Sequence, residues 1–395
     1  MARSRTIVIA GAGIGGLTAA LALTRAGFRA VVLEQAPRLE ETGAGIQLSP
    51  NATRVLFDLG LAERLRPLAV APDAIRIVNG ASGRDIARVP LGATVSQRYD
   101  APYWVIHRAD LQAVLAITIA ENPDVTLRLG TRVEDVAIHP HGVTVQARDA
   151  QGPRDEQGIA LIGADGLWST LRTRLGERRG PRFAQRTAWR AVVPAARLTD
   201  EFRANVTGLW LGRDAHLVHY PVKGSREINI VAIVRDDWHE EGWSAPGQPG
   251  ELAARFAGFA PQARALIAVP ERWQKWALFD RPPGHPRTSV PVTLLGDAAH
   301  PMLPFLAQGG AMAIEDAAVL ARCLGRDEDI AGALRAYERA RRARVARAQN
   351  EARRNAWRYH LAGPLGMARN MFVAAMGGEK LLRRYDWLYG WRPEE

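Results

Sequence analysis

The sequence predicts an α/β fold in which a mostly antiparallel β-sheet interrupts a parallel one, and three observations support this. Residues 5–34 have the strand, glycine-rich turn, helix and strand pattern of a βαβ unit. Between 183 and 280 this pattern gives way to short strand-like runs separated by turns. From Pro291 to Asp297 an apolar run typical of a buried parallel strand returns. The first domain is therefore expected to be discontinuous.

The βαβ unit contains a glycine-rich turn whose residues have separate physical tasks. Gly11 permits the tight turn out of the strand, and Gly13 lets the backbone approach a pyrophosphate at the positive end of the helix dipole. Gly15 completes the motif, and Gly16 lets the helix pack close to the sheet. Glu34 ends the next strand, where its carboxylate can accept a hydrogen bond from a ribose hydroxyl. A carboxylate here disfavours a 2′-phosphate, so the sequence predicts FAD or NAD, and not NADP, at this site.

Further elements follow from apolar periodicity and turn residues. Ser49 and Pro50 suit the start of one helix, and Asp110 favours the start of another. Strands are predicted near residues 75–78, 86–89, 125–129, 143–147 and 159–162, and helices near 251–268, 310–323 and 330–360. We divide the chain into a nucleotide-binding framework at 1–72, 99–182 and 281–360, substrate-type sheet segments at 73–98 and 183–280, and a C-terminal helical tail at 361–395.

Composition excludes several classes of function. The chain of 395 residues has a net charge of +11, carried almost entirely by arginine. The excess of arginine reflects either a bias in amino-acid composition or a positive electrostatic field that attracts anionic substrates and reduced nicotinamide. No basic stripe interleaved with aromatics is present, so nucleic acid is not an expected partner. Cys323 is the only cysteine, which excludes a disulfide framework and a thiolate metal site. No apolar run reaches the ~18 residues of a membrane span, so we expect a cytoplasmic protein without stable membrane association.

Five arginines fall within the long helix predicted near 330–360. They are Arg339, Arg341, Arg342, Arg344 and Arg347. Charge runs of this kind usually form a solvated face of a helix, which is what we expect here, with an anion-binding site as the alternative.

Three motifs in order carry a family resemblance. They are the glycine turn, Gly163-Ala-Asp165-Gly166, and Gly296-Asp297-Ala-Ala-His300-Pro301. With them the chain resembles the single-component flavin aromatic hydroxylases (group A flavoprotein monooxygenases) over nearly its whole length. Residues 43–51 and 381–391 are most similar to salicylate hydroxylase and 3-hydroxybenzoate 6-hydroxylase relatives. The resemblance implies a Rossmann-type FAD-binding domain like that of para-hydroxybenzoate hydroxylase, with NADH or NADPH as co-substrate.

The resemblance also implies which residues hold FAD. Asp297 would accept from a ribityl hydroxyl, and a helix starting at Gly309 and Gly310 would place backbone N–H groups under the isoalloxazine ring. The other implied contacts are Ala44, Gly45, Arg108, Val133 at the adenine, Asp165, Arg172 at the phosphates of the nicotinamide donor, and Pro304. Three positions depart from the family pattern: Gln35 replaces a common arginine, Gln47 a histidine of pyridine hydroxylases, and Pro304 a glutamine over the ring.

The aromatic substrate is expected against the antiparallel sheet. In a strand His216 and Tyr220 share one face, whereas His219 points to the opposite face. His216 matches, in motif context, a histidine that deprotonates a phenol in relatives, although it could instead be a hydrogen-bonded core histidine. Arg190 either binds a substrate carboxylate or pairs structurally.

The expected activity is hydroxylation of a small phenolic or carboxylated aromatic compound with NAD(P)H and O₂ through a flavin C4a-hydroperoxide. Two alternatives remain: a hydroxylase of a larger polycyclic or quinone-like compound, and a flavin-binding protein without hydroxylase turnover. The expected partners are the aromatic substrate, O₂ and NAD(P)H, with a homodimer as one candidate assembly.

Overall fold

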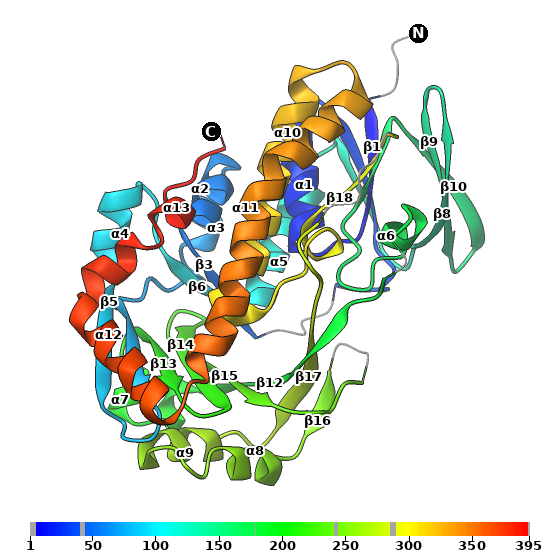
Figure 1. Ribbon diagram of the computed structural model, residues 1–395. Coiled ribbons are helices and arrows are strands. Elements are labelled where there is room, and N and C mark those ends of the chain that lie inside the picture. The colour runs from blue at the N-terminus through cyan, green and yellow to red at the C-terminus, as the bar shows by residue number, and fades with distance from the viewer. Residues whose placement is uncertain (1–4, 40–43, 178, 241–243, 285–289, 394–395) are drawn as a thin grey trace.

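The computed structural model describes residues 5–39, 44–177, 179–240, 244–284 and 290–393. One core of the molecule is a five-stranded parallel sheet (Figure 1). Its strand order is β18 (Val292–Leu294), β11 (Ala160–Gly163), β1 (Thr6–Ala10), β2 (Arg29–Leu33) and β7 (Val125–Arg128). β18 pairs in parallel with β11, so residues more than a hundred positions apart complete one sheet.

Two different layers cover this parallel sheet. On one face pack α1 (Ile14–Arg25), α5 (Arg108–Ala120) and α10 (Gly309–Arg326). The other face packs on an antiparallel sheet of β8 (Arg132–His139), β9 (Gly142–Asp149) and β10 (Gly152–Gly158). The strands of the parallel sheet are apolar and buried, as expected where both faces are covered.

The second core is an eight-stranded sheet. Its order is β16 (Ala245–Gly247), β17 (Trp273–Asp280), β12 (Arg182–Pro194), β15 (Glu227–Arg235), β14 (Ala215–Val222), β13 (Val206–Leu211), β4 (Ala74–Asn79) and β5 (Asp85–Pro90). All its pairs are antiparallel except β13 with β4, which is parallel. One face packs on α7 (Asp200–Arg203), α8 (Pro249–Arg255) and α9 (Pro261–Ala268). The opposite face lies towards the C-terminal helices (Figure 1).

The C-terminal helices span both cores. α11 (Ile330–Tyr359) runs from the parallel sheet to the eight-stranded sheet (Figure 1). α12 (Gly363–Arg383) packs on β5 and is interrupted at Gly377, whose φ of 71° is not helical. α13 (Asp386–Tyr389) then returns the chain towards α2 (Pro50–Asp58). No helix in the described part of the chain is long and apolar enough to span a membrane.

Short elements complete the fold. α3 (Ala62–Leu65) precedes β4 in the chain, and α4 (Gly92–Tyr99) follows β5. α6 (Thr170–Arg174) follows β11. β3 (Gly45–Leu48) pairs with β6 (Trp104–His107) in a separate two-stranded sheet. Three 3₁₀ turns lie at Ala195–Arg197, Gly296–Ala298 and Pro304–Leu306. The strands and helices expected from periodicity are all present, whereas β3, β6, β8, β10, β13, β16 and β17 were not expected. The six-segment domain division stays a prediction.

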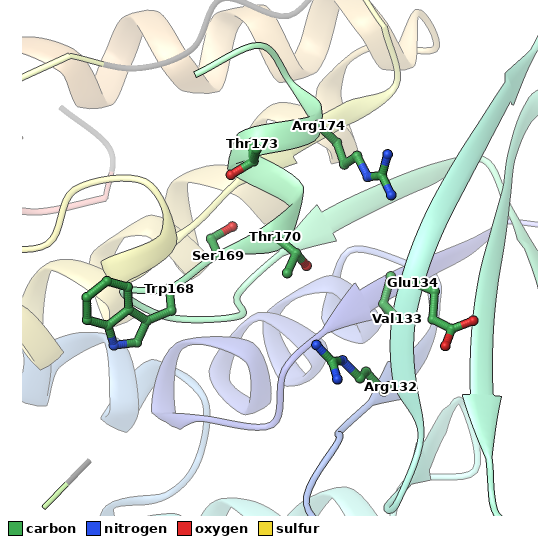
Figure 2. Close-up of a pocket in the computed structure, with 8 residues that line it drawn as sticks. All are labelled: Arg132, Val133, Glu134, Trp168, Ser169, Thr170, Thr173 and Arg174. Carbon is green, nitrogen blue, oxygen red and sulfur yellow. The ribbon is translucent and has the colours of Figure 1, made fainter. Parts of the chain in front are cut away.

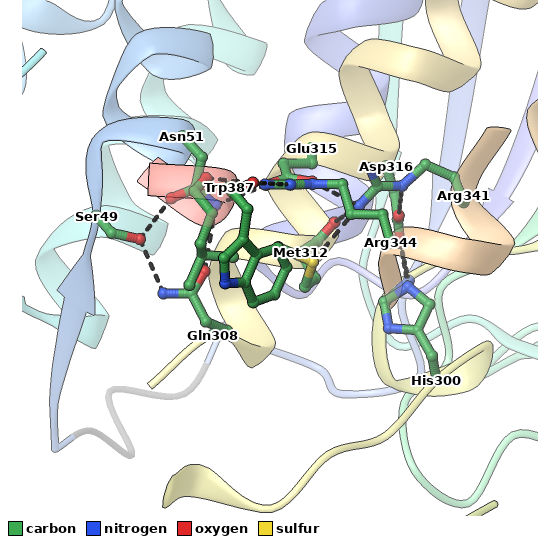
Figure 3. A network of polar contacts seen from close by, with 12 residues as sticks. Ser49, Asn51, His300, Gln308, Met312, Glu315, Asp316, Arg341, Arg344 and Trp387 are labelled. Carbon is green, nitrogen blue, oxygen red and sulfur yellow. Dashed lines mark hydrogen bonds and ion pairs between the residues drawn. The ribbon is translucent and has the colours of Figure 1, made fainter. Parts of the chain in front are cut away.

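The expected solvated arginine face on α11 is wrong for two of its members. Arg341 is 1% exposed and binds Glu315 at 2.8 Å and Asp316 at 2.6 Å. Arg344 binds Glu315 at 2.6 Å. Figure 3 shows these contacts joining α10 to α11. The arginines are buried because α10 lies against this face of α11, which charge patterning alone could not indicate.

We call this set of side chains the α10–α11 ion network. His300 Nε2 lies 2.5 Å from Asp316, the backbone N–H of Gly296 donates to Asp316 at 2.9 Å, and Asn51 donates to Glu315 at 2.6 Å. Burial alone would raise the pKa of Asp316, but His300 and Arg341 lower it below its usual value. The network therefore fixes the Gly296–His300 segment against both helices.

Candidate active site

The glycine turn after β1 has the geometry of a phosphate-binding loop. Gly11 has a φ of 107°, which favours glycine, and its N–H donates to the carbonyl of Leu33 at 2.7 Å. A Cβ on Gly16 would lie 2.0 Å from the Gly11 oxygen, whereas a Cβ on Gly13 would meet nothing within 4 Å. No acidic residue occupies the first turn of α1. The start of α1 is thus open to an anion.

Glu34 is held at the end of β2, beside this turn. Its Oε2 accepts a hydrogen bond from the Ala12 N–H at 2.7 Å, and its Oε1 accepts from the Ala36 N–H at 2.9 Å. Gly15 packs inwards instead, because a Cβ there would approach Leu295 within 2.6 Å. The four glycines therefore divide into packing positions and one position open to a ligand.

A recess of about 580 Å³ lies between β8 and α6 (Figure 2). It is lined by Arg132, Val133, Glu134, Trp168, Ser169, Thr170, Thr173 and Arg174. Val133, the expected adenine contact, is one of these residues. Among the described residues Arg132 has no ion pair, whereas Arg174 lies 3.6 Å from Asp135. The recess is polar enough to receive the adenosine end of a dinucleotide.

Arg172, expected at the phosphates of the nicotinamide donor, binds backbone carbonyls. Its side chain is buried, and the residue is 4% exposed. The guanidinium donates to the carbonyl of Ala298 at 3.0 Å and to those of Ala299 and Gly284. These contacts join α6 to the segment after β18, while Nε of Arg172 is buried and has no partner among the described residues, so its role at the donor phosphates stays a prediction.

Asp165 lies at the end of β11 with half of its carboxylate unused. Oδ2 accepts from the Leu171 N–H at 3.3 Å, while Oδ1 is buried and has no partner among the described residues. Burial raises the pKa of this carboxyl group. Gly166 follows with a φ of 77° and open space at its Cβ position. An unsatisfied oxygen beside an open glycine fits a polar ligand group.

Asp297 is exposed although its neighbours from Gly296 to His300 are buried. Dense protein around its carboxylate raises its pKa by burial, an effect that His300 and Arg108 oppose. Asp297 therefore presents its side chain to solvent from an otherwise buried segment. α10 begins beside it, because a Cβ on Gly309 would lie 3.9 Å from Asp297 Oδ1. No acidic residue occupies the first turn of α10.

The segment around β3 connects the start of α10 to the eight-stranded sheet. Arg108 donates its backbone N–H to the Ala44 carbonyl at 3.1 Å. The Gly45 N–H donates to Asn229 Oδ1 on β15 at 2.7 Å. A Cβ on Gly45 would lie 2.4 Å from the ring of Tyr220, and one on Gly310 would lie 2.6 Å from Ile46. Residue 43, the first of the stretch 43–51 that resembles relatives, lies outside the described residues.

The strand register brings Arg190, His216 and Tyr220 onto one face of the eight-stranded sheet. Three rows cross β12, β15 and β14 in turn: Ala188–Ile233–His216, Arg190–Val231–Val218 and Val192–Asn229–Tyr220. The central row is only partly buried, whereas Ile233, His216, Asn229 and Tyr220 on either side are buried. The middle of this face is therefore less completely covered than its two sides. We call it the open row.

Arg190, in the open row, is a cation without an anion. Its guanidinium lies 4.1 Å from the Trp276 ring, but no hydrogen bond or ion pair to a described residue satisfies it, and its Nε is sealed from solvent. Burial lowers its pKa to about 10, so it stays protonated at neutral pH. An unpaired charge is costly even where the side chain is only partly buried, because its sealed Nε has lost water without gaining a partner. An anionic ligand would remove that cost.

His216 borders the open row and contacts Phe305, Tyr359 and His360. Its Nδ1 lies 2.9 Å from Nε2 of His360. Burial and nearby positive charge lower the pKa of His216 well below its usual value, so the ring is neutral at pH 7. His219 lies on the opposite face against Phe202, as strand periodicity requires.

Tyr220 closes the other side of the open row. Burial raises its pKa, an effect that Arg190 opposes. Nearby, the Tyr103 hydroxyl donates to Gln47 on β3. Pro304 begins the 3₁₀ turn before α10 and is partly exposed, while Phe305 is buried.

Sequence reasoning missed four residues at this site: Tyr103, Arg186, Trp276 and His360. None belongs to a motif, and each reaches the site by packing between elements distant in sequence. The only available signal was the strand period, which places Trp276 on the same face of β17 as Leu278.

Comparison with known proteins agrees with this geometry. Residues 4–352 match the model of a family described as FAD binding domain. The chain belongs to this family. It is 40% identical over 385 residues to 3-hydroxybenzoate 6-hydroxylase 1 of Aquipseudomonas alcaligenes, covering 97% of both chains. It is also 40% identical to 3-amino-4-hydroxybenzoate 2-monooxygenase PtmB3 of Streptomyces platensis, covering 97% of this chain and 95% of the relative.

A solved structure supports the same fold. A salicylate hydroxylase substrate complex superposes with a TM-score of 0.84 at 25% identity, covering 100% of this chain and 97% of the other. The predicted fold class is confirmed: a Rossmann-type FAD-binding domain with a large sheet and C-terminal helices. The predicted family is confirmed as well, and this chain is an FAD-dependent aromatic monooxygenase by descent.

Proposed function

We propose that this enzyme hydroxylates a hydroxybenzoate, using FAD with NADH or NADPH and O₂. The observation that carries the substrate class is the unpaired guanidinium of Arg190 in the open row. A carboxylate placed there would form charge-assisted hydrogen bonds. The two relatives above are named for 3-hydroxybenzoate and 3-amino-4-hydroxybenzoate, which both carry a carboxylate and a hydroxyl group.

FAD fits the residues that surround its expected path. The open start of α1 and Glu34 would hold the pyrophosphate and a ribose, and the recess containing Val133 would hold the adenine. Asp297, Arg108 and the start of α10 would hold the flavin half. Bound FAD supplies electron transfer from the nicotinamide and activation of O₂.

The protein's own contribution is to orient the aromatic ring. Arg190 would bind the carboxylate, and His216 and Tyr220 border the row on either side, where a ring hydroxyl can reach them. His216 Nε2 would contact the phenolic oxygen, because Nδ1 is occupied by His360. Val218 and Val231 form an apolar floor between these polar groups, which is the composition expected of a pocket for a small aromatic acid.

A paired substrate assay tests this proposal. The purified yellow protein is given NADH with 3-hydroxybenzoate, salicylate or 3-amino-4-hydroxybenzoate, and with phenol as a matched compound without the carboxylate. We expect at least one benzoate, and not phenol, to accelerate NADH oxidation and yield a product one oxygen atom heavier. Stimulation by phenol alone, or none by any benzoate, would contradict the proposal.

We further propose that two copies of the chain associate in the cytoplasm through α12. Trp357, Leu365, Met367, Met371 and Phe372 are 59–71% exposed and lie on the end of α11 and on α12, at the edge of the molecule (Figure 1). Together these five leave on the order of a few hundred Å² of apolar surface uncovered, which is a substantial share of the ~800 Å² that each partner buries in a standard interface. Five large apolar side chains exposed on neighbouring helices favour a contact with a second copy.

Light scattering after gel filtration tests this association. We expect the mass of two chains, and a single chain for Met371→Glu. Ile138→Glu serves as the matched control, because Ile138 is 47% exposed on β8, away from α12. A single-chain mass for the unmodified protein would contradict the proposal. If that single chain also bound anionic vesicles, the exposed side chains would belong to a membrane contact instead.

A further inference from the structure

Three side chains from three elements form a hydrogen-bonded chain behind the open row. Arg186 of β12 donates from Nε to Nδ1 of His360 at 3.3 Å. His360, which follows the last residue of α11, contacts His216 of β14 through Nε2 and Nδ1 at 2.9 Å. Arg186 is further held by the carbonyls of Ala184 and Ala356.

Arg186 sets the direction of donation along these hydrogen bonds. A guanidinium donates hydrogen bonds and cannot accept them, so Nδ1 of His360 must be the unprotonated nitrogen. A neutral His360 then carries its proton on Nε2 and donates it to Nδ1 of His216. It follows that neutral His216 carries its own proton on Nε2.

Charge around the pair keeps both rings neutral. Burial, Arg186 and Arg369 lower the pKa of His360 to about 3. Burial, His360 and Arg186 lower that of His216. The other side chains packed on His216 are Phe305 before α10 and Tyr359 of α11, and neither offers a negative charge. A proton relay that charges His360 is therefore disfavoured.

The outer nitrogen of His216 is available to a ligand. Nε2 has no hydrogen-bond partner in the described part of the chain, and it is not among the sealed unpartnered polar atoms, unlike Nδ1 of His219. His216 lies in the register row next to Val218 of the open row.

We propose that Arg186 and His360 are positioning residues that hold neutral His216 with its proton on Nε2, so that His216 is a hydrogen-bond donor to the phenolic oxygen. This inference rests on the proposed function and replaces the expected role of His216 as a base with that of a hydrogen-bond donor. The substrate then reacts as a phenolate. Its O–H bond breaks with the electron pair remaining on oxygen, and the proton goes to bulk water. The Nε2–H stabilises the resulting oxyanion, which is the more nucleophilic form of the ring.

Nitrogen NMR tests the tautomer on the resting holoenzyme. With ¹⁵N-labelled histidine, ring nitrogens that carry a proton are distinguished from those that do not, and His216→Gln and His360→Gln assign the signals. We expect His216 to be protonated at Nε2 and unprotonated at Nδ1. A proton on Nδ1 of His216, or on both nitrogens, would overturn the proposal. The measurement needs no substrate, so a failure of the proposed hydroxylation would be recognised separately.

Variants test the consequence for catalysis. His360→Glu places an acceptor against Nδ1 and should move the His216 proton there, lowering kcat/KM about tenfold or more, as expected when a donor to a charged group is lost. Arg354→Gln is the matched control, because Arg354 lies on the same helix, is largely exposed and pairs with Glu351. It should leave the tautomer unchanged. If His360→Glu fails to fold, Arg186→Met should give a mixture of His216 tautomers. Unchanged kcat/KM with a reversed tautomer would overturn the donor role.

Discussion

The α10–α11 ion network and the open row are both enclosed by protein, but they treat charge in opposite ways. In the network, Arg341 is 1% exposed and is paired with both Glu315 and Asp316. In the open row, Arg190 has an aromatic ring beside it and no anion among the described residues. Buried charge that is paired holds segments together, whereas buried charge left unpaired is available to a ligand.

The largest expected effect comes from breaking the network. Asp316→Asn removes a carboxylate that binds Arg341, His300 and the Gly296 N–H, and leaves buried positive charge less compensated. We expect a loss of about 3 kcal/mol in the free energy of unfolding, measured by urea denaturation at pH 7. Asp329→Asn is the control, since Asp329 is 62% exposed where it pairs with Arg335. Equal losses in the two variants would contradict the structural role of the network.

The same carboxylate predicts a dependence on pH. The pKa of Asp316 is lower in the folded protein than its ordinary value of about 3.9. Its contribution to stability is therefore present above that ordinary value and is lost as pH falls through the lower, folded value. Unfolding at a series of acidic pH values should show a smaller decrease for Asp316→Asn than for the unmodified protein. If the unfolding free energies of the two proteins fell in parallel with pH, the predicted contribution of Asp316 would be contradicted.

The second effect compares two histidines on opposite faces of β14. His216→Leu should lower kcat/KM roughly 10- to 100-fold, because a hydrogen bond to a charged oxygen is lost. His216→Gln should lose less, since its amide can still donate. His219→Gln should keep the rate, because His219 packs on Phe202 away from the open row. Flavin absorbance checks that each variant retains FAD. A larger loss in His219→Gln than in His216→Leu would reverse the assignment.

The third effect concerns Arg190 and has opposite signs for binding and stability. Arg190→Met should raise KM for a hydroxybenzoate about tenfold, through loss of a charge-assisted contact. The same change removes an uncompensated buried charge, so the free energy of unfolding should stay constant or rise. Steady-state kinetics and urea denaturation measure the two quantities. A destabilised variant with normal KM would show that Arg190 is structural.

The smallest effect is expected at the rim of the network. Arg347 is exposed and lies 4.0 Å from the centre of the Trp387 ring. Arg347→Ala should cost about 0.5–1 kcal/mol of unfolding free energy, the range of an exposed cation–π contact. Arg342→Ala, also exposed and on the same helix, provides the comparison. No difference between the two would mean that Trp387 is held by Arg344 alone.

Local signals in the sequence predicted the parts of the fold that depend on local physics. The glycine turn required Gly11 and Gly16 for backbone reasons, and the structure shows a positive φ at the first and a 2.0 Å approach at the second. Strand periodicity separated His216 and Tyr220 from His219. The return of an apolar strand near residue 292 predicted the discontinuous sheet.

Features that depend on packing between distant segments could not be predicted. Arg341 is buried because α10 covers it, and the spacing of charges on α11 contains no trace of that contact. Arg172 has the position of a phosphate ligand in the motif, yet it points to carbonyls about 126 residues away. His360 lies 144 positions from His216, in a stretch with no motif.

Gly45 constrains any effort to redesign the enzyme for bulkier substrates. Its missing side chain is what lets the β3 strand press against the Tyr220 ring, with 2.4 Å between an added Cβ and that ring. A library that varies position 45 alone would force the Tyr220 ring out of its present position. Varying Tyr220 to smaller residues first would open room both for a larger guest molecule and for alanine at position 45, so the two codons should be randomised together.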